Sequence, residues 1–310
     1  MSSDARARGR PGQVVATAGR RVIVRDEEGE RACFLAGQRA VVGDRVLFVD
    51  APGEGGKITS VAPRGAVLAR ADAKGRDQIL AANLQGIAIV TSPSDPPFRA
   101  GLVDRYLVAA GSGGLAAVVV LNKSDLGVPD DVEAELALRR AAGVPVLVVS
   151  ALTEGGIGPL RDLLATADGP WALVGHSGVG KTSLVAALLP GEDVGEIGHI
   201  SAYWGRGRHT TSGSRLFAVP GGGQIVDSPG IRTFAPGRLT AGAVRASFPG
   251  LSDLRCRFRD CLHRDDEQGC VAPTEVDPAL LASYRRLLAE IQDIDDARRP
   301  SRGGSPRSER

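Results

Sequence analysis

The sequence lacks an uncharged apolar run of membrane-spanning length, because the stretch from residue 106 to 121 is short and interrupted by glycines. Its first 12 residues are polar and arginine-rich, without the apolar centre of a signal peptide. The net charge is only +2 at pH 7, which is too small to demand a nucleic-acid partner. We therefore expect a cytoplasmic protein without a membrane partner.

Cysteine is scarce, and three of the four cysteines lie within fifteen residues of one another, with a histidine among them. In a reducing compartment this grouping favours a metal over disulfides. Three thiolates and one imidazole can close a tetrahedral Zn²⁺ site with no open position, which suits a structural role. The alternative to a metal site is three reduced cysteines in the core, but the charged residues between them indicate an exposed loop. The predicted zinc ligands are Cys256, Cys261, His263 and Cys270.

The sequence does contain a complete phosphate-binding motif. Residues 175–182 fit G-x-x-x-x-G-K-[ST], with an apolar run before them and a helical run, 183–189, after them. Glycines let backbone N–H groups surround a polyphosphate, Lys181 reaches the outer phosphates, and the Thr182 hydroxyl can ligate Mg²⁺. A glycine-rich turn that binds nothing is the alternative, and both flanks argue against it. The predicted phosphate-binding residues are Gly175, His176, Ser177, Gly178, Val179, Gly180, Lys181, Thr182 and Ser183.

A second motif indicates which nucleotide base the protein recognises. The apolar run 116–121 leads into Asn122-Lys123-Ser124-Asp125, an N-K-x-D element. The Asp125 carboxylate can accept from N1–H and N2–H₂ of guanine, a donor pair that adenine lacks, while Asn122 braces the site and the Lys123 stem covers the ring. After a predicted strand at 144–149, Ser150 and Ala151 form a weaker match in which the Ala151 N–H could reach guanine O6. We therefore expect GTP rather than ATP.

Two further segments predict the magnesium site. A long stretch, 191–214, lacks periodicity, and a loop of that length beside a phosphate site is typically functional. Within it, Thr210 or Thr211 is predicted to complete the Mg²⁺ shell with Thr182. A predicted strand at 224–226 then leads into the D-x-x-G element Asp227-Ser228-Pro229-Gly230. Asp227 would reach Mg²⁺ through water, and the Gly230 N–H would sense the γ-phosphate.

The order of these elements is informative. In an ordinary small GTPase the phosphate loop comes first, then D-x-x-G, then N-K-x-D, whereas here the elements at 122 and 150 precede the loop at 175. Loops that leave one edge of a sheet can still assemble one site after such a rearrangement. Alternating apolar strands and helices from about residue 66 predict a mostly parallel sheet. We expect a circularly permuted, α/β phosphate-loop GTPase domain.

Other domains flank it. Between residues 12 and 61, five short alternating strands suit a small closed β-barrel such as an OB-fold, a frequent platform for single-stranded nucleic acid; a different small barrel is the alternative. Beyond the cysteines, Asp277 and Pro278 begin a helix. The predicted multidomain order is a disordered leader at 1–10, an OB-fold β-barrel at 11–66, the GTPase domain at 67–237, a C-terminal α-helical zinc-binding domain at 238–297 and a disordered basic tail at 298–310.

Taken in order over about residues 12–295, N-K-S-D, S-A-L, G-H-S-G-V-G-K-T, G-R-H-T-T, D-S-P-G and C-x4-C-x-H-x6-C resemble the ribosome small-subunit-dependent GTPase family. The resemblance implies a factor in late maturation of the small (30S) ribosomal subunit and a contact with 16S rRNA. It further implies stimulation by the subunit, binding in the GTP state and release on hydrolysis. One departure is Asn83-Leu84-Gln85, where the family pattern is Asn-x-Asp. We expect a monomer.

Hydrolysis needs a positioned water and compensation of charge on the phosphoryl oxygens. Where many GTPases place a glutamine after D-x-x-G, this chain has Ile231, whose alkyl side chain cannot orient water. We predict a slow intrinsic rate, completed by His209 or by a ribosomal group; the resemblance favours His209, and Lys181 compensates charge in either case. Two other functions stay open: a GTP-dependent metallochaperone, and an RNA-binding assembly protein with structural GTP.

Overall fold

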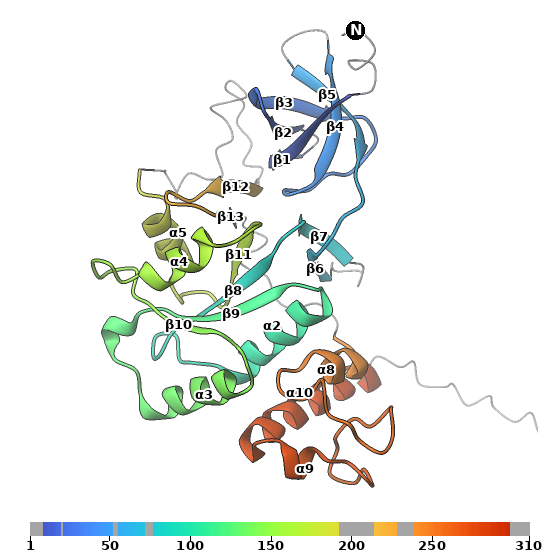
Figure 1. Ribbon diagram of the computed structural model, residues 1–310, viewed down its shortest axis with the longest axis vertical. Coiled ribbons are helices and arrows are strands. Elements are labelled where there is room, and N and C mark those ends of the chain that lie inside the picture. Colours follow the sequence, from blue (N-terminus) through green and yellow to red (C-terminus); the bar gives the residue numbers. More distant parts are fainter. Residues whose placement is uncertain are drawn as a thin grey trace, which may run out of the picture.

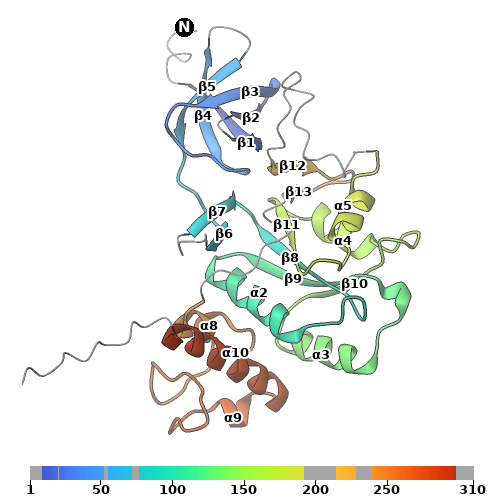
Figure 2. The same ribbon diagram turned by 180° about the vertical axis from the view of Figure 1, so that it is seen from behind.

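The computed structural model describes residues 9–19, 21–51, 55–71, 77–191, 214–227 and 239–297. Figures 1 and 2 show a β-barrel at one end of the long axis, an α/β body in the middle and a group of helices at the other end. This order confirms the predicted fold class. Within the described residues, no helix has the length and apolar character needed to cross a bilayer. Residues 1–8 and 298–310, in the predicted leader and tail, lie outside the described ranges.

The N-terminal barrel has the five strands that the alternating pattern predicts. In sheet order they are β1, β2, β3, β5 and β4, and β4 pairs with β1 to close the barrel. Its interior holds apolar side chains from alternate positions, among them Val14, Val24 and Phe48, and it also contains Cys33. The barrel is therefore OB-like, with bounds Arg10–Ala18 (β1), Arg21–Asp26 (β2), Gly29–Leu35 (β3), Arg45–Ala51 (β4) and Gly55–Val61 (β5).

The central sheet has five parallel strands in the order β10, β9, β8, β11 and β13, followed by antiparallel β12. Its strands are Gly86–Thr91 (β8), Ala116–Leu121 (β9), Val146–Val148 (β10), Trp171–Val174 (β11), Ser214–Ala218 (β12) and Gln224–Asp227 (β13). β10 is shorter than the predicted strand 144–149. A hairpin that the sequence pattern did not indicate, Val67–Ala71 (β6) and Asp77–Ala82 (β7), precedes β8.

Helices cover both faces of this sheet, which explains why its strands read as unbroken apolar runs. Along β8, Ile87 and Ile89 join the core beneath α2 and α3, while Ala88 and Val90 join the core beneath α4 and α5. The helices span Ala100–Ser112 (α2), Asp130–Ala141 (α3), Gly158–Ala165 (α4) and Lys181–Leu188 (α5), and a 3₁₀ turn, η1, spans Ser124–Leu126.

The barrel and the central sheet are one continuous hydrogen-bonded structure. β1 pairs with β12 in antiparallel register, with Ala16 opposite Arg215 and Thr17 opposite Ser214. Val15 and Ile23 of the barrel share an apolar core with Leu216 of β12. The division at residues 66 and 67 stays a prediction.

Asn83 and Gln85, where the sequence departs from the Asn-x-Asp pattern, lie close to where the barrel meets the central sheet. Asn83 donates from Nδ2 to the Gly43 carbonyl (2.8 Å) and accepts at Oδ1 from the Gly65 N–H (2.9 Å). Gln85 accepts at Oε1 from the Gly169 N–H (2.8 Å), so its amide supplies an acceptor where the family pattern has a carboxylate.

The C-terminal helices pack on α2 rather than on the sheet. They span Ala241–Ser247 (α8), Ala272–Glu275 (α9) and Pro278–Ala297 (α10). Phe248, Tyr284 and Leu287 form their core, together with Val108 of α2. The predicted N-cap is confirmed, because Asp277 Oδ1 accepts from the Ala279 N–H at 2.8 Å.

Two aspartates of the barrel test how much buried pairing stabilises it. Asp44 is 0% exposed and accepts from Arg64 Nε (2.7 Å) and Nη2 (2.8 Å), whereas Asp50 is 57% exposed between Arg10 and Arg31. We expect Asp44→Ala to lower the free energy of unfolding by ~2–3 kcal/mol, because Arg64 would lose its anion and the Val41 N–H its acceptor. Asp50→Ala should cost less than about 1 kcal/mol. Urea unfolding followed by circular dichroism compares them, and equal losses would contradict this.

Candidate functional site

The predicted nucleotide elements that the structure describes lie at the carboxyl ends of parallel strands, along one edge of the sheet. Asn122 follows β9, Ser150 follows β10 and Gly175 follows β11, while Asp227 ends β13. Carboxyl ends of parallel strands meet at one edge whatever the order along the chain. The fold therefore brings the predicted guanine elements beside the phosphate loop.

The phosphate loop needs its glycines for two close approaches. Gly175 has φ +142°, and a Cβ there would lie 2.1 Å from the Val90 carbonyl oxygen. Gly180 has φ +90°, and a Cβ there would lie 2.3 Å from Asn122 Nδ2. Side chains at either position would push the loop away from β8 or from the guanine element. The loop is thus held tightly between its two neighbours.

Lys181 is the first residue of α5 and is buried, at 7% exposure. Its Nζ donates to the carbonyl oxygens of Gly175 and His176, at 2.7 Å each, so the ammonium lies inside the curve of the loop. A cation held there attracts phosphate oxygens. Thr182 and Ser183 follow it with exposed side chains, and buried Asp227 ends β13.

Asn122 joins the phosphate loop to the predicted base loop. Its Nδ2 donates to the Val179 carbonyl (2.9 Å), and its Oδ1 accepts from the Ala151 N–H (3.1 Å). Its side chain is buried, and the bond to Val179 is fully buried while the bond from Ala151 is partly buried. The predicted bracing role of Asn122 therefore has a geometric basis.

Asp125 and Lys123 are also held by neighbours. Ser150 Oγ donates to Asp125 Oδ1 at 2.5 Å, which orients the carboxylate predicted to read guanine. Lys123 has φ +63°, a left-handed conformation, and its Nζ donates to the Asp95 carbonyl at 2.5 Å.

The segment of residues 92–98, between β8 and α2, is part of this site although sequence reasoning missed it. The Asp95 carbonyl of this segment accepts from Lys123 Nζ. Within the segment, Ser92 Oγ donates to the Pro96 carbonyl (2.6 Å). Pro96 Cδ lies only 3.3 Å from the place of a Cβ on Gly178. The segment thus touches both the base loop and the phosphate loop. Its proline-rich composition is the signal of a rigid loop that could have indicated it.

Several predicted residues lie outside the described ranges. They are His209, Thr210, Thr211 and Gly230.

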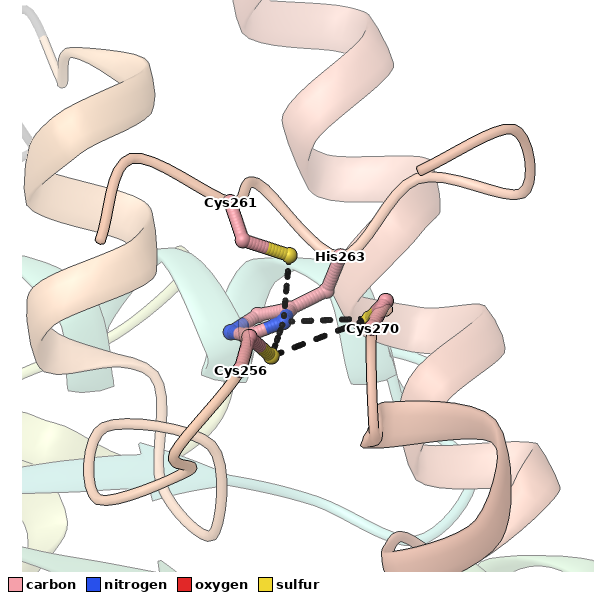
Figure 3. A group of neighbouring side chains, drawn as sticks. All are labelled: Cys256, Cys261, His263 and Cys270. Carbon is pink, nitrogen blue, oxygen red and sulfur yellow. Dashed lines mark hydrogen bonds between the residues drawn. The ribbon is translucent and has the colours of Figure 1, made fainter. Parts of the chain in front are cut away.

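The four predicted metal ligands converge, as Figure 3 shows. Their ligand atoms all lie within 4.8 Å of one another, and His263 Nδ1 is 3.4–3.5 Å from the three sulfurs. A tetrahedral Zn²⁺ with ordinary bond lengths has S···N edges of about 3.5 Å and S···S edges of about 3.8 Å. Cys256 Sγ and Cys270 Sγ are 4.0 Å apart. The residues therefore fit a zinc ion bound through three thiolates and Nδ1.

Neighbouring groups hold the metal loop in shape. Glu267 Oε2 accepts from the N–H groups of Leu262 (2.6 Å) and His263 (3.2 Å), and His263 has φ +56°. Burial raises the pKa of the Cys261 and Cys270 thiols and lowers the pKa of His263, so burial alone keeps all three neutral. A bound divalent cation would reverse this for the thiols.

Comparison with known proteins gives consistent matches. The model of the RsgA GTPase family matches residues 61–236. The chain is 41% identical over 300 residues to "Small ribosomal subunit biogenesis GTPase RsgA" of Azotobacter vinelandii, covering 91% of this chain and 86% of that protein. It is 40% identical over 298 residues to the protein of that name from Pseudomonas aeruginosa strain LESB58, covering 92% and 86%.

Two crystal structures share the fold. YjeQ from Thermotoga maritima superposes with a TM-score of 0.72 at 28% identity, covering 91% of this chain and 98% of that one. YloQ, described as a circularly permuted GTPase, superposes with a TM-score of 0.69, covering 92% and 96%. At 22% identity, YloQ supports the fold alone.

Asp125→Asn tests the predicted reading of guanine. An asparagine amide can accept from N1–H but cannot also accept from N2–H₂, so GDP affinity should fall ~10–100-fold. Xanthosine diphosphate carries a carbonyl at that position, to which the new amide can donate, so its affinity should rise. Calorimetric titration measures both, with Asp130→Asn, an exposed residue in the first turn of α3, as the control. Parallel losses for both nucleotides would refute the assignment.

Glu267→Ala tests the support of the metal loop. Loss of the acceptor for two backbone N–H groups should weaken Zn²⁺ binding by ~10–100-fold, because His263 would no longer be held in its left-handed conformation. Competition with a chromogenic chelator measures the affinity. Asp266→Ala, at the exposed neighbouring residue, should leave it unchanged. Equal zinc affinity in the two variants would show that the carboxylate has no such role.

Proposed function

This chain belongs to the RsgA GTPase family, and from that membership we propose that it is a GTPase acting in the biogenesis of the small ribosomal subunit. The structural observation that supports a GTPase site is Asn122, whose amide hydrogen-bonds both the phosphate loop and the base loop. A protein that merely bound phosphate would not need a buried side chain to brace the phosphate loop against the loop predicted to read guanine.

The residues of the nucleotide site take these roles in the proposal. The phosphate loop and Lys181 hold the phosphates, Asp125 and Ala151 read guanine, and Thr182 and Asp227 hold Mg²⁺, directly and through water. Mg²⁺ would neutralise charge on the β- and γ-phosphate oxygens. Because Ile231 cannot orient water, we assign that task to His209 or to a ribosomal group.

The 30S subunit and its 16S rRNA are the proposed partners, in the cytoplasm. The GTP form of a monomeric protein would bind the subunit, and hydrolysis would release it. We propose a structural role for zinc, which the closed set of four ligands supports, since a metal handed on to another protein would need an open coordination position.

The function is tested by GTP hydrolysis with the purified protein alone, with small subunits, with large subunits and with free RNA. We expect at least about tenfold stimulation by small subunits only, since binding alone positions no water. Lys181→Ala serves as the blank, because it removes the cation inside the phosphate loop. Equal rates of GTP hydrolysis in all four mixtures would contradict the proposal.

His209→Ala, assayed in the same mixtures, tests whether His209 or a ribosomal group orients the attacking water. Loss of the stimulation with retained GTP binding supports His209. Undiminished stimulation assigns the task to the ribosome.

A further inference from the structure

Three consecutive residues of α10 contact two different parts of the molecule. Tyr284 donates from its hydroxyl to the Leu262 carbonyl (2.8 Å), and Arg285 donates from Nε to the carbonyl of the metal ligand His263 (2.8 Å). Ser283, by contrast, donates from Oγ to Asp104 Oδ2 of α2 (2.5 Å). One helical turn therefore joins the metal loop, residues 256–270, to the GTPase domain.

The group that Ser283 reaches is a buried ion pair. Arg139 Nη2 of α3 donates to both oxygens of Asp104, at 2.9 and 3.0 Å, and these side chains are only 1% and 2% exposed. Burial raises the pKa of Asp104 even though Arg139 lies against it. Such a pair depends on exact placement of its partners, because little water can replace a lost contact. The relative positions of α2, α3 and α10 are thus linked.

The helix α2 reaches the phosphate loop, and α3 follows the predicted base loop along the chain. Tyr106, two residues after Asp104, is buried and lines a small cavity of about 10 Å³ together with Gly175, His176 and Val179 of the phosphate loop. The neighbouring Gly175 backbone lowers the pKa of the Tyr106 phenol, although burial raises that pKa overall to about 12. α3 begins five residues after Asp125. The helix α2, which meets the metal loop through α10, therefore also packs beside the phosphate loop.

From these contacts we propose that metal binding at Cys256, Cys261, His263 and Cys270 and guanine-nucleotide binding at the phosphate loop are coupled, each favouring the other. The inference rests on the proposed function, since it takes zinc and GTP as the ligands. The coupling involves two states of the protein: in one, bound zinc orders the metal loop, and in the other, the metal loop holds no zinc. Without zinc, the carbonyls that Tyr284 and Arg285 hold are no longer fixed, and α10 holds Asp104 less firmly. Nucleotide would then have to order a looser site.

The coupling is measured by calorimetric titration of GDP, which is not hydrolysed, into zinc-loaded and metal-stripped protein. Stripping should weaken GDP binding by about fivefold or more, and linkage requires saturating GDP to raise zinc affinity by the same factor in a chelator competition. Equal GDP affinity in the two forms overturns the coupling. Failure of the zinc-loaded protein to bind GDP would instead overturn the proposed function.

Two serine variants test the route on zinc-loaded protein, so no metal has to be removed. Ser283→Ala deletes the donor to Asp104 and should weaken GDP binding several-fold, without touching the nucleotide. Ser247→Ala is the matched control, because the Ser247 hydroxyl of α8 lies 3.3 Å from Ser112 Oγ of α2 but makes no hydrogen bond to the buried pair among the described residues. It should bind GDP like the unchanged protein. Unaltered GDP binding by Ser283→Ala overturns the route.

Discussion

The amide of Asn122 is the interaction on which the nucleotide site depends most. Its Nδ2 donates to the phosphate loop and its Oδ1 accepts from the base loop, so neither loop can move without breaking a buried or partly buried hydrogen bond. Both loops start from strands of one parallel sheet, which explains why the site survives an altered order of elements along the chain. In this fold, the spatial order of strand ends determines the site, and the connections between them are secondary.

The sequence was sufficient wherever chemistry restricts the choice of residue. Gly175 and Gly180 are needed because other side chains would collide with backbone or with Asn122, and Asp277 is needed to cap α10. The four predicted zinc ligands are recognisable because their spacing can serve one ion, and the structure brings them together. Such residues carry a local signal, and the structure places them as expected.

The parts that could not be predicted depend on partners far away in sequence. Nothing near Ser214 indicates that β12 pairs with β1, about two hundred residues earlier. Arg139 lies in a helix with charged neighbours and resembles a solvated residue, yet it is fully buried against Asp104. The β6–β7 hairpin and the 92–98 segment were missed for a similar reason, since their importance comes from what they pack against. His209, Thr210, Thr211 and Gly230 stay predictions.

The pairing of β1 with β12 also protects an edge. Without the barrel, β12 would be the outermost strand on that side of the central sheet and would present unpaired N–H and C=O groups to other chains. The barrel is thus more than an added module for contacts with a partner. It closes a surface that would otherwise invite strand addition and aggregation, so the GTPase sheet and the barrel have to evolve, and to be engineered, as one unit.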